Sequence, residues 1–365
     1  MQFKATEDFS VMTLKKSVVV TDQLENVLGT VISSFPDDKL FLVMDRNSER
    51  FCLPLICDTP NIERFKKVVI PNGEEHKSLS SVEQIWLFLS QSGADRKSLV
   101  VNLGGGMVTD LGSFAASTFK RGVEFVNIPT TLLSQVDASV GGKTGFNFNG
   151  FKNEIGVINQ PHQVIIDTRF LKTLDHENII SGYAEMIKHG LIHSQEHLAE
   201  LRKFDLHRPD YAILQGMIAR SVMIKEYFVE KDPREKNIRK ALNFGHTIGH
   251  AFESYSLKKS QPLLHGHAVA FGMIAELYLS RLNCGFPDGI LHHLSGWISS
   301  IYGKYPIETA DYETFYELMG HDKKNEGKRI NFTLITSVGE VEINRDCTKE
   351  QIFEALDYFR ELNND

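Results

Sequence analysis

Two histidines stand four residues apart in NFGHTIGHAFE, which covers residues 243–253. They are His246 and His250, and residues four apart share one face of a helix. Two imidazoles on one helix face can bind one metal ion. A zinc peptidase would need glutamate directly after the first histidine, where Thr247 stands. The spacing therefore indicates a metal site, with histidines that bind no metal as the alternative, and it disfavours a peptidase.

Further donor residues occur on both sides of this pair. LLHGHAV offers His265 and His267, and SGYAEMIKHG offers Glu185 with Lys188 one helical turn along. A catalytic zinc typically takes three protein ligands and leaves one position for substrate. Two histidines and one glutamate fit that pattern.

A glycine turn in SLVVNLGGGMVTDLGSFAAS leads from a predicted strand into a predicted helix. Glycine lets the backbone approach a pyrophosphate, and a helix N-terminus supplies amide donors. The dinucleotide motif GxGxxG is not met, because Thr109 occupies the third glycine position. Nucleotide binding is the favoured interpretation, and a tight strand–helix turn is the alternative. Asp45, at the end of LFLVMD, would accept from a ribose hydroxyl or serve as a strand-end turn residue.

Basic residues gather among glycines in IPTTLLSQVDASVGGKTGFNFNGFKNEIG, residues 128–156. The segment holds Asp137, Lys143, Lys152 and Asn153, and Arg121 lies just upstream. Lysine and arginine at short range suit a phosphate or a carboxylate. We predict an anion-binding segment here, with a charged loop in solvent as the alternative.

The composition is that of a globular protein, with 42% hydrophobic and 24% charged residues. A net charge of -7 does not suggest a nucleic-acid or anionic-membrane partner. The longest apolar stretch falls short of the ~20 residues that a membrane span needs. Scattered cysteines and a polar N-terminus favour a cytoplasmic protein.

Short apolar runs alternate with amphipathic segments in the first half of the chain. The predicted strands are 40–44, 98–103, 123–128 and 163–167, with helices at 78–93 and 109–120 between them. Such alternation predicts a Rossmann-like parallel sheet covered by helices. We therefore expect an α/β nucleotide-binding domain over residues 1–174.

Apolar spacing becomes mostly helical beyond this point. The predicted helices are 178–205, 210–230, 239–256, 267–283, 288–302, 312–320 and 349–363. One strand pair interrupts them at 329–343, with a turn near Gly339. We expect a mainly α-helical metal- and substrate-binding domain over residues 175–365.

Six motifs occur in one order along the chain: GGGMVTD, IPTTLLSQVDASVGGKTG with FKN, GYAEMIKHG, LNFGHTIGH, LHGHAVAFGM and HDKKN. Together, over roughly residues 40 to 340, they resemble the 3-dehydroquinate synthase family. The resemblance implies a lyase that uses NAD and zinc, with cobalt as an alternative metal. Its reaction would convert 3-deoxy-D-arabino-heptulosonate 7-phosphate to 3-dehydroquinate and phosphate, in the shikimate pathway of aromatic amino-acid biosynthesis. A homodimer is also implied.

The resemblance implies residue roles position by position. The metal ligands would be Glu185, His246 and His265. The substrate site would contain Arg121, Asp137, Lys143, Asn153, Lys188, Lys225, Glu235, Arg239, Asn243, His250 and one of Lys323 and Lys324, with Lys324 preferred. NAD would be held by Asp45, Glu74, Lys77, Gly105, Gly106, Asp110, Thr130, Thr131, Lys143, Lys152, Phe170 and Thr173.

Some positions depart from the family pattern. His267 stands where many relatives carry glutamate, and we expect it to point away from the metal. His189, His193 and His197 are expected to face solvent. Asn147 replaces an aspartate of some relatives, which should matter little.

Three rival functions stay open. A sister sugar-phosphate cyclase, of valiolone or scyllo-inosose type, would share both cofactors but differ around the substrate carboxylate. Arg239, Asn243, His250 and the motif DKK at residues 322–324 favour the dehydroquinate reaction over it. An iron-containing alcohol or glycerol dehydrogenase would not need the lysine-rich segment. A binding-only descendant should have lost a ligand or a pocket lysine, and none is missing.

Overall fold

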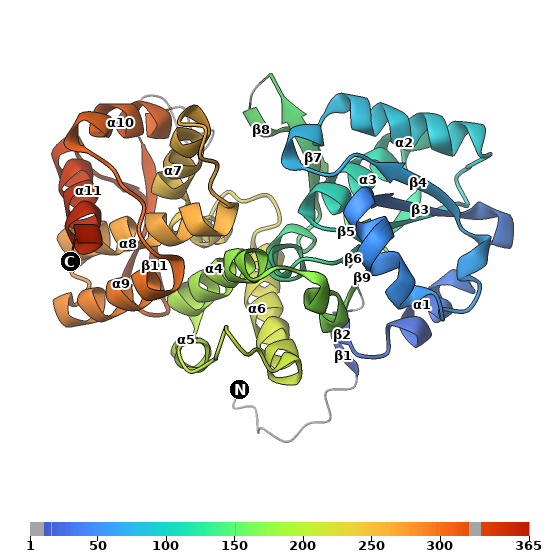
Figure 1. Cartoon of the computed structure of the whole chain (residues 1–365), viewed down its shortest axis with the longest axis horizontal. Coiled ribbons are helices and arrows are strands. Elements are labelled where there is room, and N and C mark those ends of the chain that lie inside the picture. The colour runs from blue at the N-terminus through green and yellow to red at the C-terminus, as the bar shows by residue number, and fades with distance from the viewer. Residues whose placement is uncertain (1–10, 16, 150, 321–329, 365) are drawn as a thin grey trace. The chain divides into compact units, whose positions relative to one another are not determined.

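The computed structural model describes residues 11–15, 17–149, 151–320 and 330–364. Two compact units make up the chain (Figure 1). Unit 1 runs through Asp175 and takes in His207–Met223, and unit 2 comprises His176–Leu206 and the chain from Ile224 onward. Helix α6 (Tyr211–Lys231) therefore begins in unit 1 and ends in unit 2. The assignment of residues 1–174 to NAD and 175–365 to metal and substrate stays a prediction.

A seven-stranded sheet forms unit 1, in the order β1-β2-β9-β6-β5-β3-β4. The strands are β1 (Val11–Lys15), β2 (Val18–Thr21), β3 (Leu40–Asp45), β4 (Lys66–Ile70), β5 (Leu99–Gly104), β6 (Glu124–Pro129) and β9 (Gln163–Ile166). Every pairing is parallel except that of β1 with β2. Strands β3, β5 and β6 are almost continuously buried, as befits strands covered on both faces. The predicted parallel α/β sheet is confirmed.

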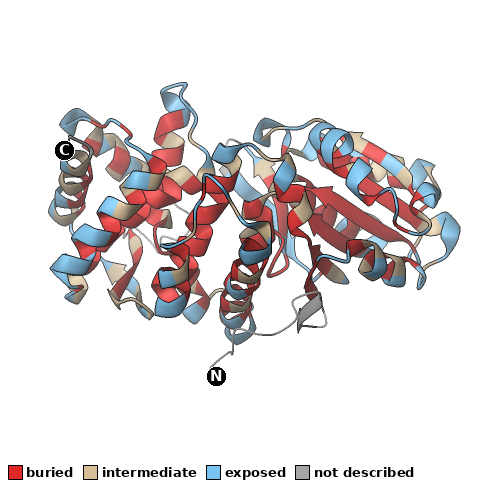
Figure 2. Cartoon of the chain, turned by 60° about the horizontal axis from the view of Figure 1, so that its bottom comes forward, coloured by how far each residue is buried: buried red, intermediate tan, exposed pale blue. Residues whose placement is uncertain are grey.

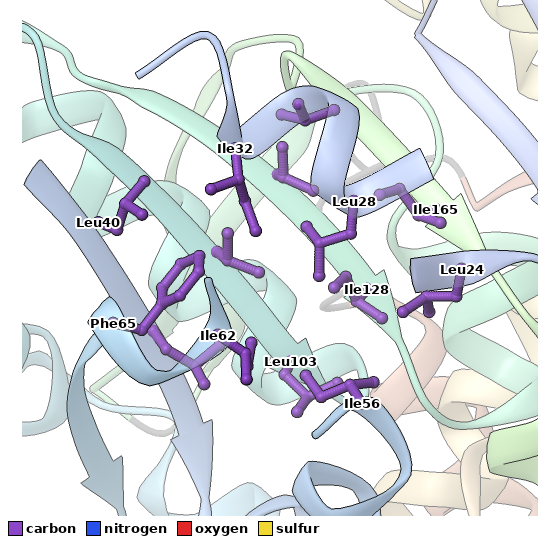
Figure 3. Close-up of a cluster of buried hydrophobic side chains, with 14 of the residues drawn as sticks. Leu24, Leu28, Ile32, Leu40, Ile56, Ile62, Phe65, Leu103, Ile128 and Ile165 are labelled. Carbon is purple, nitrogen blue, oxygen red and sulfur yellow. The ribbon is translucent and has the colours of Figure 1, made fainter. Parts of the chain in front are cut away.

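Helices cover both faces of this sheet. Leu24, Leu28 and Ile32 of α1 (Leu24–Ile32) pack into an apolar cluster on one face (Figure 3). Helices α2 (Leu79–Gln91) and α3 (Gly106–Thr118) contribute to the cluster on the opposite face. Because β3, β5 and β6 are parallel neighbours, the loops that follow them leave from one edge of the sheet.

A separate antiparallel hairpin lies in the lysine-rich segment. It consists of β7 (Lys143–Phe148) and β8 (Phe151–Ile158), and it packs on α3. Gly145 and Gly156 face each other across the pair, and a Cβ on Gly156 would lie 2.0 Å from the carbonyl oxygen of Thr144. The two strands therefore approach more closely than larger residues would allow. The lysines of this segment therefore lie on a strand pair and not on a loop, and anion binding by them stays a prediction.

Arg169 connects the turn Thr168–Thr173 with α1. Its Nε lies 2.8 Å from the buried Asp167 carboxylate, and its guanidinium also pairs with Glu25. Burial raises the pKa of Asp167. We expect Arg169→Met to lower the free energy of unfolding by about 3 kcal/mol, because a buried carboxylate loses its cation. Urea unfolding measures this, with the exposed Arg46→Met as the control, and an equal loss in both variants would contradict the expectation.

Unit 2 is mainly helical, as predicted. Besides the end of α6, it contains α4 (His176–His193), α5 (Gln195–Leu201), α7 (His246–Lys258), α8 (His265–Cys284), α9 (Asp288–Tyr302), α10 (Tyr312–Gly320), α11 (Lys349–Asn364) and the strand pair β10 (Asn331–Ser337) and β11 (Glu340–Asp346). Helix α8 packs against α4, α7, α9 and α11 and is buried around most of its surface. Figure 2 shows exposed residues along the outer helix faces and buried residues inside. Among the described residues, no helix is long and apolar enough to span a membrane.

Two of the predicted helices are interrupted. The segment 178–205 divides at Ser194, whose hydroxyl accepts from the amide of His197 and begins α5. The segment 239–256 consists of a short 3-10 helix (Ile238–Asn243) and then α7. Gly245 separates these two with φ 79°, a left-handed conformation that glycine adopts readily. The break makes His246 the first residue of α7.

Candidate metal and nucleotide sites

Three helices of unit 2 bring a glutamate and two histidines together. Glu185 lies in α4 and is fully buried, while His246 and His265 begin α7 and α8. One donor atom from each lies within 4.8 Å of the others. Oε1 of Glu185 is 3.4 Å from Nε2 of His246 and 3.7 Å from Nε2 of His265. The His250 ring lies 5.4 Å from that of His246 and outside this donor group.

The orientation of both imidazoles suits a metal ion. Nδ1 of His246 lies 3.1 Å from the carbonyl oxygen of Phe244, and Nδ1 of His265 lies 3.4 Å from Oε2 of Glu253. An Nδ1 that faces an acceptor can donate to it, which leaves Nε2, on the Glu185 side of each ring, as the atom that would bind a metal. Oε1 of Glu185 is buried without a hydrogen bond within the described residues, which is costly unless a cation is present. Two imidazoles and a carboxylate fit a catalytic zinc site.

Charge is concentrated around these donors. Nζ of Lys188 pairs with Oε2 of Glu185. Burial favours the neutral form of Glu185, but Lys188 and His246 outweigh it and hold its pKa well below the ordinary value. Burial likewise opposes protonation of His265, yet Glu253 and Glu185 raise its pKa to about 10. A metal ion that binds Nε2 of His265 must displace the proton from that atom, so metal binding would release protons.

His267 does not belong to the donor group, as expected. Its Nε2 lies 3.1 Å from Oε2 of Glu177, and its ring meets Tyr302 edge to face. His265 and His267 are two positions apart in α8, so their side chains point to different faces of the helix. The difference in partners makes His267 a matched control for His265.

The expectation that three further histidines face solvent is wrong for two of them. His193 is exposed, whereas His189 and His197 are buried at 0% and 1% exposure. Helix α4 packs on α8 as well as on α5, and nearly all its residues after the first turn are buried. Its sequence therefore carries little amphipathic signal from which a solvent face could be predicted.

A loop before α7 holds several predicted substrate residues. Asp232 accepts hydrogen bonds of 2.6 to 3.2 Å from three backbone amides within residues 236–239. Arg239 is 2% exposed, and its Nη1 donates to the carbonyl of Pro233 at 2.9 Å. Nδ2 of Asn243 donates to Oε1 of Glu235 at 3.0 Å. The loop thus brings Glu235 and Asn243 together and orders the backbone at Arg239.

Of the other lysines predicted for the substrate site, the structure describes only Lys225 among Lys225, Lys323 and Lys324. Lys225 lies in the unit 2 part of α6 and is buried. Lys324, and its alternative Lys323, lie outside the described residues. Their contact with substrate stays a prediction.

Lys77 joins three parts of unit 1. Its Nζ lies 2.6 Å from Oδ2 of Asp110 in α3 and 2.5 Å from Oδ1 of Asn153 in β8. Asn147 accepts from the amide of Asn153 at 2.9 Å and donates to Oε1 of Glu74 at 3.0 Å. Residues predicted separately for NAD and for substrate therefore form one hydrogen-bonded cluster.

The glycine turn ends β5 and begins α3. Gly105 is the N-cap and has no side chain to cap the first helical amides. A Cβ at this position would lie 3.1 Å from Cγ2 of Thr131. The amide of Thr130 donates to the carbonyl of Gly104 at 2.9 Å, which ties the loop after β6 to the turn. Gly106 starts the helix, so an N-terminus suited to phosphate lies beside both threonines.

Three predicted NAD residues make contacts within unit 1 that explain their positions. Oδ1 of Asp45 accepts from the amide and hydroxyl of Ser48 at 2.7 and 2.8 Å, which is the strand-end turn left open by the sequence. Phe170 is fully buried in the apolar cluster beneath α1, so its side chain does not line a surface. Thr173 donates to the carbonyl of Phe170 at 2.7 Å.

The remaining predicted residues of unit 1 lie on loops and on the hairpin. Arg121 is exposed and has φ 70°, while Asp137 is half-buried in the turn Ser134–Ala138. Lys143 begins β7 and Lys152 lies in β8, and both are exposed. Long cationic side chains at these places can bend toward a bound phosphate.

The sequence analysis missed two buried carboxylates. Glu253 lies one turn after His250 in α7, and Glu276 lies inside the apolar stretch AVAFGMIAELYL of α8. A glutamate inside an otherwise apolar helix is seldom buried without a partner. The apolar sequence around Glu276 could have indicated that this carboxylate is buried. The spacing of residues does not show which groups pair with it.

We expect Glu253→Gln to weaken Zn²⁺ binding by about 10- to 100-fold, because it removes the carboxylate that orients His265. Competition with a chromophoric chelator at fixed pH measures the affinity. The exposed Glu354→Gln is the control and should bind like the unsubstituted protein. Equal affinity in all three proteins would show that Glu253 does not support the site.

Family comparisons agree with the motifs. Residues 67–181 match the 3-dehydroquinate synthase N-terminal family and residues 182–325 the 3-dehydroquinate synthase C-terminal family. A 3-dehydroquinate synthase of Parabacteroides distasonis is 53% identical over 347 residues, which cover 95% of this chain and 98% of that relative. Another from Clostridium tetani is 36% identical over 363 residues, covering 97% and 88%.

A solved structure shares the fold. It is a 2-epi-5-epi-valiolone synthase of Streptomyces hygroscopicus with NAD+ and Zn2+ bound, similar at a TM-score of 0.83 and 24% identity over 99% of both chains. At that identity the likeness concerns the fold alone. The sequence matches cover nearly the whole chain and confirm the resemblance: the chain belongs to the 3-dehydroquinate synthase family.

Proposed function

We propose that this chain converts 3-deoxy-D-arabino-heptulosonate 7-phosphate to 3-dehydroquinate and phosphate, as a carbon–oxygen lyase that depends on NAD and a divalent metal. The observation that carries the proposal is the donor group Glu185, His246 and His265, in a family member whose motifs are intact. The valiolone synthase of the same fold, solved with NAD+ and Zn2+, supports the choice of both cofactors.

The metal-binding helices of unit 2 would provide the electrophilic site. When bound, zinc would act as a Lewis acid on substrate oxygens, and NAD would accept and return a hydride without net redox change. Three protein ligands leave a coordination position for substrate. The carbonyl of Phe244 and the carboxylate of Glu253 hold the two imidazoles in place. The buried ammonium of Lys188 would stabilise negative charge that develops beside the metal.

His250 is our candidate for proton transfer at the ring-closing stage. Its ring lies 5.4 and 6.1 Å from the rings of His246 and His265, so it sits beside the metal donors without belonging to them. Imidazole titrates near neutral pH, which suits a group that gives and takes protons. Arg239 and Lys225, both buried cations, are assigned to the substrate carboxylate.

Unit 1 would hold the nucleotide and the phosphate that leaves. The N-terminus of α3 at Gly105 and Gly106 suits the pyrophosphate. Arg121, Lys143 and Lys152 are assigned to the substrate phosphate. Cations bound to the phosphate would hold the leaving group in a fixed orientation for elimination. The homodimer and the cytoplasmic location remain predictions from the family resemblance.

A substrate panel tests the assignment. Phosphate release is measured with NAD and zinc on the heptulosonate phosphate, sedoheptulose 7-phosphate and glucose 6-phosphate. The proposal predicts turnover of the heptulosonate phosphate only. Turnover of either other sugar phosphate instead would assign the chain to a sister cyclase. NADH that accumulates with an alcohol or glycerol would assign it to the dehydrogenases.

A further inference from the structure

Glu276 is a fully buried carboxylate of α8 that the proposed reaction does not use. Its Oε2 accepts from the amide of Gly245 at 2.6 Å, and its Oε1 accepts from the amide of Ile248 at 3.0 Å. Gly245 is the N-cap of α7 and has no side chain of its own for capping. Glu276 therefore caps α7 from a neighbouring helix, and His246 lies between the two amides that it holds.

Close helix packing allows the carboxylate to reach this turn. Gly272 lies four residues before Glu276, on the same face of α8. A Cβ at Gly272 would lie 2.0 Å from the carbonyl oxygen of Gly245 and 2.5 Å from the amide nitrogen of Gly249. The backbones of α7 and α8 are thus in direct contact one turn away from Glu276. Any side chain at residue 272 would push the start of α7 away.

Electrostatics explain why a charged group is used here. A buried carboxylate is costly unless hydrogen bonds compensate it. The start of α7 provides amide donors and the positive end of the helix dipole. Hydrogen bonds to an ionised acceptor are about twice as strong as neutral ones. The turn at His246 is therefore held more firmly than a glycine cap alone would hold it.

We propose that Glu276 is a positioning residue that fixes residues 243–248 so that His246 meets the other two metal donors. The same turn carries Asn243, and the next turn of α7 carries His250. Loosening it would displace three predicted site residues together. The inference rests on the proposed metal function of Glu185, His246 and His265.

Glu276→Gln is the direct test. Glutamine has the same size as glutamate, but its side-chain NH₂ group is a donor. That group would face the N–H of Gly245 or Ile248, so one of the two hydrogen bonds is lost. We expect Zn²⁺ affinity to fall by about tenfold, as for other groups that orient a ligand. The absorption spectrum of the Co²⁺-loaded protein should also change, because it reports the geometry of the ligands.

Leu277→Ala is the matched control for lost stability. Leu277 is the next residue of α8 and fully buried, so its truncation leaves a cavity while Glu276 keeps both amide bonds. Glu276→Asp, which keeps the charge but cannot span both amides, should fall between Glu276→Gln and the unsubstituted protein. It also serves as the test variant if the glutamine variant fails to fold.

Chelator competition, the cobalt spectrum and the melting temperature are read for each variant. The proposal is supported if the Glu276 variants bind Zn²⁺ more weakly and have an altered Co²⁺ spectrum, while Leu277→Ala shows neither change. Unchanged affinity and spectrum in the residue 276 variants overturn it, as does an equal effect of Leu277→Ala. An unsubstituted protein that binds neither Zn²⁺ nor Co²⁺ would overturn the proposed metal function itself.

Discussion

Replacing His265 by asparagine is expected to abolish metal retention and to lower turnover by about 10³-fold, whereas His267→Asn leaves both nearly unchanged. His265 presents Nε2 to the donor group, and losing one of three ligands removes several kcal/mol of charge stabilisation in the transition state. His267 instead pairs with Glu177. The two substitutions are chemically identical and two residues apart, so they separate a ligand from its neighbour.

Metal content after dialysis and phosphate release at saturating substrate measure this pair. Without zinc the His267 variant should melt close to the unsubstituted protein, and the His265 variant should melt lower, because Glu185 and Glu253 lose the imidazolium that pairs with them. A far-ultraviolet circular dichroism spectrum like that of the unsubstituted protein in both variants excludes misfolding as the cause. Zinc retained by the His265 variant and lost by the His267 variant would move the site to His267 and require a new ligand set.

Lys188→Met is expected to destabilise the metal-free protein by about 3 to 5 kcal/mol. Lys188 is 1% exposed and pairs with the fully buried Glu185, and breaking a buried pair leaves an uncompensated charge. Zinc should restore most of this loss, because the ion supplies positive charge to the same carboxylate. Turnover should remain about 10²-fold low, because the ammonium no longer stabilises charge on the substrate.

Melting temperatures with and without zinc test this account of Lys188. The increase caused by zinc should be larger in Lys188→Met than in the unsubstituted protein. The exposed Lys203→Met should show the increase of the unsubstituted protein. A smaller increase in Lys188→Met would mean that the lysine does not compensate Glu185.

The central strands of unit 1 were predictable because they are buried on both faces. Such strands appear as continuous apolar runs, and 40–44, 98–103 and 123–128 correspond to β3, β5 and β6. The hairpin of β7 and β8 was not predictable in this way. Its glycines, lysines and asparagines are poor strand formers, and packing on α3 supports the pair instead. The short strands β1, β2 and β4 were also missed.

The metal donors likewise could be predicted only in part from local sequence spacing. Spacing alone suggested His246 and His250 as a pair, but the structure groups His246 with His265 and Glu185. Three separate helices meet there, and no local pattern encodes such a meeting. The family resemblance identified the three positions. The start of α7 at His246 depends on Gly245 and on Glu276 from another helix, which periodicity does not reveal.

Phosphate and dehydroquinate followed together, in metal-stripped protein supplied with NAD and the heptulosonate phosphate, test the proposed reaction most directly. Dehydroquinate is read through a dehydratase in the same tube, before and after zinc is added. We predict equal amounts of both products, only after zinc is added and without accumulated NADH. Phosphate released before zinc, or NADH that accumulates as phosphate appears, would contradict a metal-dependent reaction without net redox change.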